Sequence, residues 1–116
     1  MKTLSLYLTF VVLSCLLHSC SDRNKSEEEV GIDMLGIARQ DLADGRYAEA
    51  RDTILSLRTN HPMAIEARRG AILLMDSVEL LSAQDSLSKG LGDSEDMQLR
   101  VKFYQHKIEF DRKQLK

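Results

Sequence analysis

The side chains with the greatest capacity for nucleophilic, redox or metal chemistry in this 116-residue chain are two cysteines and three histidines. His61 precedes a proline and His106 lies between lysines, and no His-x-x-x-His or Glu-x-x-His spacing would place two metal ligands on one helix face. The glycines of residues 90–93 lack the Lys-Ser/Thr of a phosphate-binding loop, and no serine lies in a Gly-x-Ser-x-Gly elbow. The sequence therefore predicts no catalytic residue, no metal site, no cofactor and no enzyme activity.

The balance of charge argues against a second class of function. The chain has 16 basic and 18 acidic residues and a formal net charge of -2, so it lacks the polybasic character of a dedicated nucleic-acid binder. Its length allows one small domain. We therefore expect contacts with proteins or with a membrane, and no nucleic-acid partner.

The two cysteines follow or interrupt an uncharged apolar run of the kind found in targeting signals. Residues 4–17 have about the length of a signal-peptide hydrophobic region and fall short of the ~20 apolar residues that span a bilayer. The tetrapeptide Leu17-His18-Ser19-Cys20 resembles the lipobox of bacterial lipoproteins, in which the cysteine is lipidated and becomes the mature amino terminus. His18 departs from the usual small residue. The resemblance implies a signal peptide over residues 1–19 and lipidation at Cys20.

Cys15 offers a second lipobox-like site, through Val12-Leu13-Ser14-Cys15. Cleavage there would leave two leucines on the mature end, whereas Cys20 lies where the apolar run gives way to polar residues. Cys20 is therefore the favoured site. The alternative is an ordinary secretory signal or an uncleaved anchor, with Cys20 as an incidental thiol.

The residues after Cys20 are interpreted as a tether. The lipoprotein resemblance implies two or more acyl chains, enough for stable attachment, and Ser21 in place of the aspartate that retains lipoproteins in the inner membrane implies the outer membrane, at its periplasmic face or the cell surface. Residues 21–29 contain no apolar side chain, so residues 20–29 are predicted to form a flexible acidic tether. The tract Ser26-Glu27-Glu28-Glu29 either resembles the acidic export tags of some surface lipoproteins or opens a helix.

Residues 30–116 are predicted to form an all-α domain, because apolar residues recur at three- and four-residue spacings and no stretch alternates as a strand does. Glycine and proline divide the domain into segments, since glycine favours the positive φ found after a helix end and proline disfavours helical geometry in the preceding residue. The predicted helices cover residues 30–43, 47–58, 63–87 and 93–114.

The stretch Gly45-Arg46-Tyr47-Ala48-Glu49-Ala50, followed by Ile54, Leu57 and Pro62, resembles the tetratricopeptide repeat. Glycine lets the chain reverse, and Ala50 is small enough for two helices to approach closely. Residues 32–65 match best, with Met34 in place of the usual aromatic residue. The third helix matches as a degenerate half-repeat, because no Gly-aromatic turn follows it at the expected distance.

By the same resemblance, a tetratricopeptide-like domain binds peptides on the concave surface of its first helices. The matching positions are Leu35, Arg39 and Leu42 in the repeat and Glu66, Arg69 and Asp76 in the half-repeat. Arg39 and Arg69 would offer forked donors to a carboxylate. The alternative is that these are solvated arginines without a partner.

One repeat is too small to be stable by itself, since such repeats bury their faces against neighbours. The long third and fourth helices must then form an antiparallel hairpin within the chain, or a coiled coil with another chain. The stripe Met97, Val101, Tyr104 and Ile108 is compatible with either arrangement.

These observations predict a lipid-anchored envelope protein that serves as an adaptor or scaffold for an unknown envelope protein or peptide. The alternative is a structural coiled-coil lipoprotein that self-associates as a homo-oligomer and has no dedicated peptide groove. A basic excess over residues 100–116, with six basic residues against two acidic ones, could meet an anionic surface or complement the dipole of the last helix.

Overall fold

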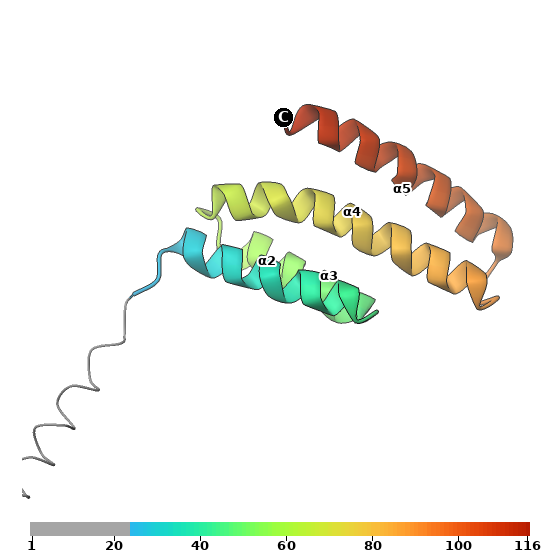
Figure 1. Cartoon of the computed structure of the whole chain (residues 1–116), viewed down its shortest axis with the longest axis horizontal. Coiled ribbons are helices and arrows are strands. Elements are labelled where there is room, and N and C mark those ends of the chain that lie inside the picture. Colours follow the sequence, from blue (N-terminus) through green and yellow to red (C-terminus); the bar gives the residue numbers. More distant parts are fainter. Residues whose placement is uncertain (1–23) are drawn as a thin grey trace, which may run out of the picture.

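The computed structural model describes residues 24–116, and all regular structure in that part of the chain is helical. The helices are α2 (Glu27–Ala43), α3 (Tyr47–Asn60), α4 (Ile65–Ser88) and α5 (Ser94–Gln114) (Figure 1). The predicted all-α class is confirmed, and each helix begins within three residues of its expected position. The signal segment, Cys15 and Cys20 lie outside the described residues.

Helix α2 begins at Glu27, three residues earlier than expected. Ser26 is its N-cap: the Ser26 hydroxyl accepts a hydrogen bond from the Glu29 amide at 3.2 Å, and the Glu29 carboxylate accepts one from the Ser26 amide at 2.8 Å. This reciprocal capping box satisfies two amides that a bare helix end leaves unpaired. Residues 27–29 therefore belong to the helical domain and not to a flexible tether.

The other two glutamates of the acidic tract cap a different helix. Helix α4 starts after Ala64 without a side-chain cap of its own. The Glu28 carboxylate accepts hydrogen bonds from the amides of Ala67 at 2.7 Å and Glu66 at 3.3 Å, and Glu27 accepts one from Met63 at 2.9 Å. Carboxylates at this end also complement the helix dipole. The acidic tract thus joins the start of α2 to the start of α4.

Glycines with positive φ form the turns on either side of the central helices, as the sequence predicts. Gly45 (φ 74°) follows α2, and Gly90 (φ 65°) and Gly92 (φ 78°) join α4 to α5. Only glycine adopts this region without steric cost. Arg46 reinforces the first turn, donating to the Asp41 carboxylate at 2.5 Å and lying 3.0 Å from that of Asp44.

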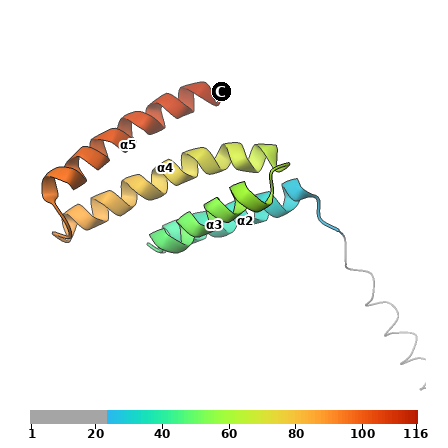
Figure 2. The same ribbon diagram turned by 180° about the vertical axis from the view of Figure 1, so that it is seen from behind.

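Helix α4 is the central element of the domain. It packs against both helices of the α2–α3 hairpin on one side and against α5 on the other, while α5 makes no close backbone approach to α2 or α3 (Figures 1 and 2). The long helices α4 and α5 therefore form an antiparallel hairpin within one chain. This is the first of the two arrangements that the sequence left open. The half-buried stripe Met97, Val101, Tyr104 and Ile108 supplies the α4-facing side of α5.

The core between the hairpin and α4 contains nine buried side chains, of which five are alanines and four are larger. Its buried members are Leu35, Ala38, Ala50, Ile54, Leu57, Ala64, Ala67, Ala71 and Val78. Alanines let helix backbones approach closely, at the cost of less apolar area per residue. The closest approach is at Gly31, where an added Cβ would lie 2.7 Å from the Ala64 Cβ and 2.8 Å from the Ala67 Cβ.

Two glycine-to-alanine substitutions in α2 are expected to have opposite effects. Gly31→Ala should destabilise the fold by about 1 to 3 kcal/mol, because the Cβ atoms it meets are attached directly to the α4 backbone and cannot rotate away. Gly36→Ala, with nothing within 4 Å of the new Cβ, should stabilise it by about 0.5 to 1 kcal/mol through helix propensity. Thermal unfolding followed by circular dichroism measures both. Equal midpoints for the two variants would contradict the close α2–α4 contact.

Candidate functional site

The six positions expected to bind a peptide do not form one surface. Leu35 is buried in the core at 5% exposure, and Leu42 is half-buried against the same core. The expectation that Leu35 lines a peptide groove is wrong, because α4 lies against its side chain at Gly70. For the partly exposed Leu42, the binding role stays a prediction.

Asp76 is also withdrawn from solvent, because α5 covers its side of α4. Its side chain is 4% exposed, and its Oδ1 atom lies 2.7 Å from the Lys107 ammonium of α5. The prediction of an open peptide-binding position is wrong here too. Asp76 joins two helices of the same chain.

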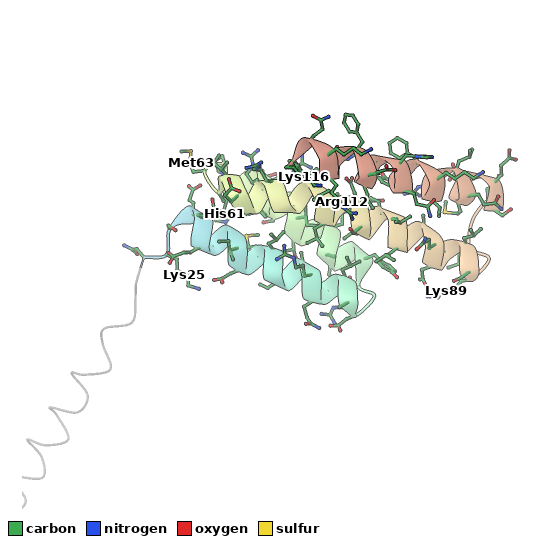
Figure 3. The ribbon with its side chains drawn as sticks, turned by 45° about the horizontal axis from the view of Figure 1, so that its top comes forward. Lys25, His61, Met63, Lys89, Arg112 and Lys116 are labelled. Carbon is green, nitrogen blue, oxygen red and sulfur yellow. The ribbon has the colours of Figure 1, made fainter. Side chains whose placement is uncertain are left out.

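Arg39, Glu66 and Arg69 are exposed, but they point to different places. The Arg39 guanidinium reaches over α4 at Gly70, where it lies 3.9 Å from the position of an added Cβ. Arg69 pairs with Glu66 at 3.2 Å and donates to the Leu115 carbonyl at 3.3 Å, near the end of α5. In Figure 3, Lys116 marks this end of α5 and Lys89 marks the turn at the other. Within the described residues, the two arginines form no common site.

A groove that the sequence does not reveal lies over α4, between α3 and α5. Its volume is about 720 Å³. The apolar part of its lining comes from all three helices and includes Leu55, Ile72, Met75 and Phe103. Leu55 and Phe103 remain 46% and 59% exposed. Exposed apolar side chains around a concavity are typical of binding surfaces.

The groove continues toward the start of α4 into a smaller hollow of about 240 Å³. Arg58 and Ile72 line both spaces, and the smaller one adds Ile65, Arg68 and Arg69. One end of the groove therefore carries three arginines beside isoleucine side chains. Guanidinium groups in this setting suit a carboxylate, which they can bind through two parallel hydrogen bonds.

The charges along the groove differ in how fully they are paired. Glu79 is held by two arginines, Arg51 at 2.6 Å and Arg100 at 3.2 Å. Arg58 and Arg68, in contrast, form no ion pair with any carboxylate of residues 24–116. The Arg68 Nε is buried and has no hydrogen-bond partner among residues 24–116, while its Nη1 donates to the Pro62 carbonyl at 2.9 Å. A buried donor without an acceptor is costly, so an acceptor bound at this end would relieve that cost.

A three-residue ionic cluster pins α5 to the middle of α4 at the groove wall. The Lys107 ammonium lies 2.7 Å from Asp76 Oδ1 and 2.6 Å from Asp111 Oδ2. Burial raises the pKa of Asp76, and the hydrogen bond from Lys107 lowers the pKa of Asp111. One ammonium thus serves two carboxylates in different surroundings. The second carboxylate oxygen of Asp76 is buried and has no hydrogen-bond partner in the part of the chain that the structure describes.

This groove can bind by apolar contact and by charge. Within residues 24–116, no group of three or more His, Cys, Asp or Glu side chains is arranged to hold a metal ion. Sequence patterns did not reveal the groove because its walls come from three separate helices. The available signal was Phe103, an aromatic residue beside the main stripe of α5.

Comparisons with protein-family models, with curated proteins and with solved structures found no match for this chain. None of the helices in the described part of the chain is long and apolar enough to cross a membrane.

Replacing Lys107 by methionine should destabilise the fold in a pH-dependent way. Without the ammonium, Asp76 and Asp111 face one another uncompensated, so the folded-state pKa of Asp76 rises further. A carboxylate whose pKa is higher in the folded than in the unfolded state makes folding less favourable as the pH rises and the group ionises. The loss of folding free energy in Lys107→Met should therefore be largest at pH 7 and smallest near pH 4. We expect the free energy of unfolding to fall by about 1 to 2 kcal/mol at pH 7. This is less than for a fully buried ion pair, because the Lys107 side chain is one-third exposed.

Thermal midpoints measured from pH 4 to pH 7 test this expectation. Lys89→Met is the matched control, since Lys89 pairs with Asp85 at the exposed end of α4, and its midpoint should follow the wild type. A Lys107→Met deficit that does not change with pH would contradict the shared-ammonium geometry.

Proposed function

We propose that this protein is a lipid-anchored component of the bacterial cell envelope that acts as an adaptor or scaffold through protein contact. The groove between α3 and α5, with its arginine end, is the observation that carries the proposal. The lipobox-like tetrapeptide ending at Cys20, followed by a polar stretch, supports the anchor. With Ser21 after the cysteine, the outer membrane is the proposed location.

The chemistry of the groove defines the kind of partner. An amphipathic segment would place apolar side chains against Leu55, Ile72 and Met75 and a carboxylate near Arg58 and Arg68. This is the helix-in-groove mode, in which an apolar stripe supplies affinity and end charges set the orientation. The proposed surface thus lies over the α3–α5 side of α4, away from the concave face that the tetratricopeptide resemblance suggested.

The anchor is tested by intact mass and detergent partitioning of the full chain expressed in a Gram-negative host. Cys20→Ala should abolish the mass increase caused by acylation and release the protein from the detergent phase. The reason is that the cysteine sulfur carries the lipid in the lipoproteins that this sequence resembles. Cys15→Ala should leave both unchanged. Lipidation that follows Cys15, or no lipid on either protein, would overturn the anchor and leave the helical domain unaffected.

The groove is tested by photo-crosslinking in living cells. A photoreactive amino acid at position 55 should yield one dominant adduct of defined mass. The same residue at position 37, an isoleucine of α2 with 56% exposure, is the matched control and should not yield that adduct. Arg58→Glu should reduce the position-55 adduct at least fivefold, because it places a negative charge where the partner's carboxylate binds.

Arg58 forms no intramolecular ion pair in the described residues, so helicity of the Arg58→Glu variant should match the wild type in circular dichroism. Equal adducts at positions 55 and 37, or adducts insensitive to Arg58→Glu, would exclude this groove as the partner site.

A further inference from the structure

Helix α5 carries a second apolar stripe that is more than half exposed in the described chain. Leu99, Phe103 and Phe110 are 60%, 59% and 60% exposed. Side chains project from α5 on the side away from α4 (Figure 3). Large apolar side chains aligned on one face of an exposed helix mark an interaction surface more often than isolated ones do.

This outer stripe is distinct from the one that packs on α4. The half-buried residues Met97, Val101, Tyr104 and Ile108 form the inner side, whereas Leu99, Phe103 and Phe110 repeat at four and seven residues on another side. Phe103 also borders the groove described above, but Leu99 and Phe110 do not line it. Helix α5 therefore has two apolar sides, and among the described helices it packs closely against α4 alone.

The outer side follows the heptad spacing of a coiled-coil seam. Successive steps of three and four residues connect its six exposed members, and steps of this kind keep one face of a helix directed at a partner helix. The seam consists of Asp96, Leu99, Phe103, His106, Phe110 and Lys113. Its centre is apolar and aromatic, one end is acidic and the other is basic.

This seam is complementary to itself when two copies run antiparallel. Placing Leu99 opposite Phe110 of the second copy also places Phe103 opposite His106 and Asp96 opposite Lys113, so both ends join opposite charges. A parallel pair would instead set Asp96 against Asp96 and Lys113 against Lys113, which is unfavourable.

The residues beside the seam favour the same orientation. Glu95, Lys102 and Glu109 are exposed and recur every seven residues along one edge of α5, and the exposed Lys116 follows at the same spacing two residues beyond the end of the helix. In the antiparallel arrangement, Glu95 comes opposite Lys116 of the second copy, and Lys102 comes opposite Glu109. Flanking charges of this kind determine which helices pair and in which direction.

We propose that the protein forms an antiparallel homodimer through the outer side of α5. The occupant of this surface is a second copy of the chain, and the inference does not depend on the lipid anchor or on the groove. If the anchor is present, confinement to a membrane surface would raise the effective concentration and favour a dimer with a short seam.

Cross-linking of the full-length chain in cells tests the orientation. Two differently tagged copies, one with Asp96→Cys and one with Lys113→Cys, are treated together with a short bis-maleimide. The antiparallel seam places these positions opposite one another, whereas two copies of position 96 are separated by roughly 25 Å at 1.5 Å per residue. The expected product is a cross-link between positions 96 and 113, identified by mass spectrometry of the joined peptides.

Cross-links of 96 to 96 and 113 to 113 would show a parallel pair and overturn the proposal, as would the absence of any cross-link through these positions. Both cysteine sites are exposed, so neither change should affect folding. The chain with only its own cysteines is the background control.

Variants assayed by the same cross-link distinguish dimerisation through α5 from partner binding in the groove. Phe110→Asp should lower the yield at least tenfold and His106→Leu should raise it, since leucine replaces a polar side chain within the seam. Leu55→Asp, a comparably exposed residue on α3, should leave it unchanged. If Leu55→Asp lowered the cross-link yield as much as Phe110→Asp does, the proposed seam would be overturned. If the photo-crosslinked adduct at position 55 persisted in Phe110→Asp, the groove would bind its partner without the dimer.

The flanking charges give a further test. Lys102→Glu and Glu109→Lys should each lower the yield when one variant supplies both copies, because like charges then face each other at both of the symmetry-related contacts between positions 102 and 109. Co-expression of the two variants should restore it, because each copy then meets the opposite charge. Yields that do not depend on the combination would contradict the predicted alignment.

Discussion

The close approach of α4 to the α2–α3 hairpin is the contact on which the other features of the domain depend. Gly31 and the alanines at 64, 67 and 71 make this approach possible, since any larger side chain at Gly31 would meet the Cβ atoms of Ala64 and Ala67. Helix α4 lacks a cap of its own and relies on Glu27 and Glu28 of α2. Packing and capping therefore fix α4 against the hairpin together, and α5, the groove and the outer seam are all positioned by α4.

A core of small side chains leaves large apolar ones for the surface. Leu55, Leu99, Phe103 and Phe110 are each at least 46% exposed although the domain is small. Helix α5 is held to α4 by half-buried side chains and by polar contacts such as Asp76–Lys107, without one fully buried residue of its own. Partly buried ion pairs add little net stability but fix geometry. The arrangement is therefore specific in position while keeping the outer side of α5 available for contacts.

Much of the fold could be predicted from the sequence because its signals are local. Helical periodicity and the turn residues at Gly45, Pro62 and Gly90 identified the helices and most of their ends. The acidic tract had two readings, and the structure gives Ser26 to Glu29 a capping role that makes residues 27–29 part of α2. The groove-lining role expected of Leu35 and Asp76 failed for a non-local reason. Their exposure depended on which helix would cover them.

The sequence by itself determined the helical class, the turns, the lipobox-like segment and the repeating spacing of apolar residues on α5. Only the tertiary structure decided which of the two α5 stripes packs on α4, and thereby which remains for another molecule. It also brought Arg58, Arg68 and Arg69 to one end of a groove that no single segment encodes. Helix patterning depends on neighbours a few residues apart, whereas a surface shared by three helices depends on how those helices pack.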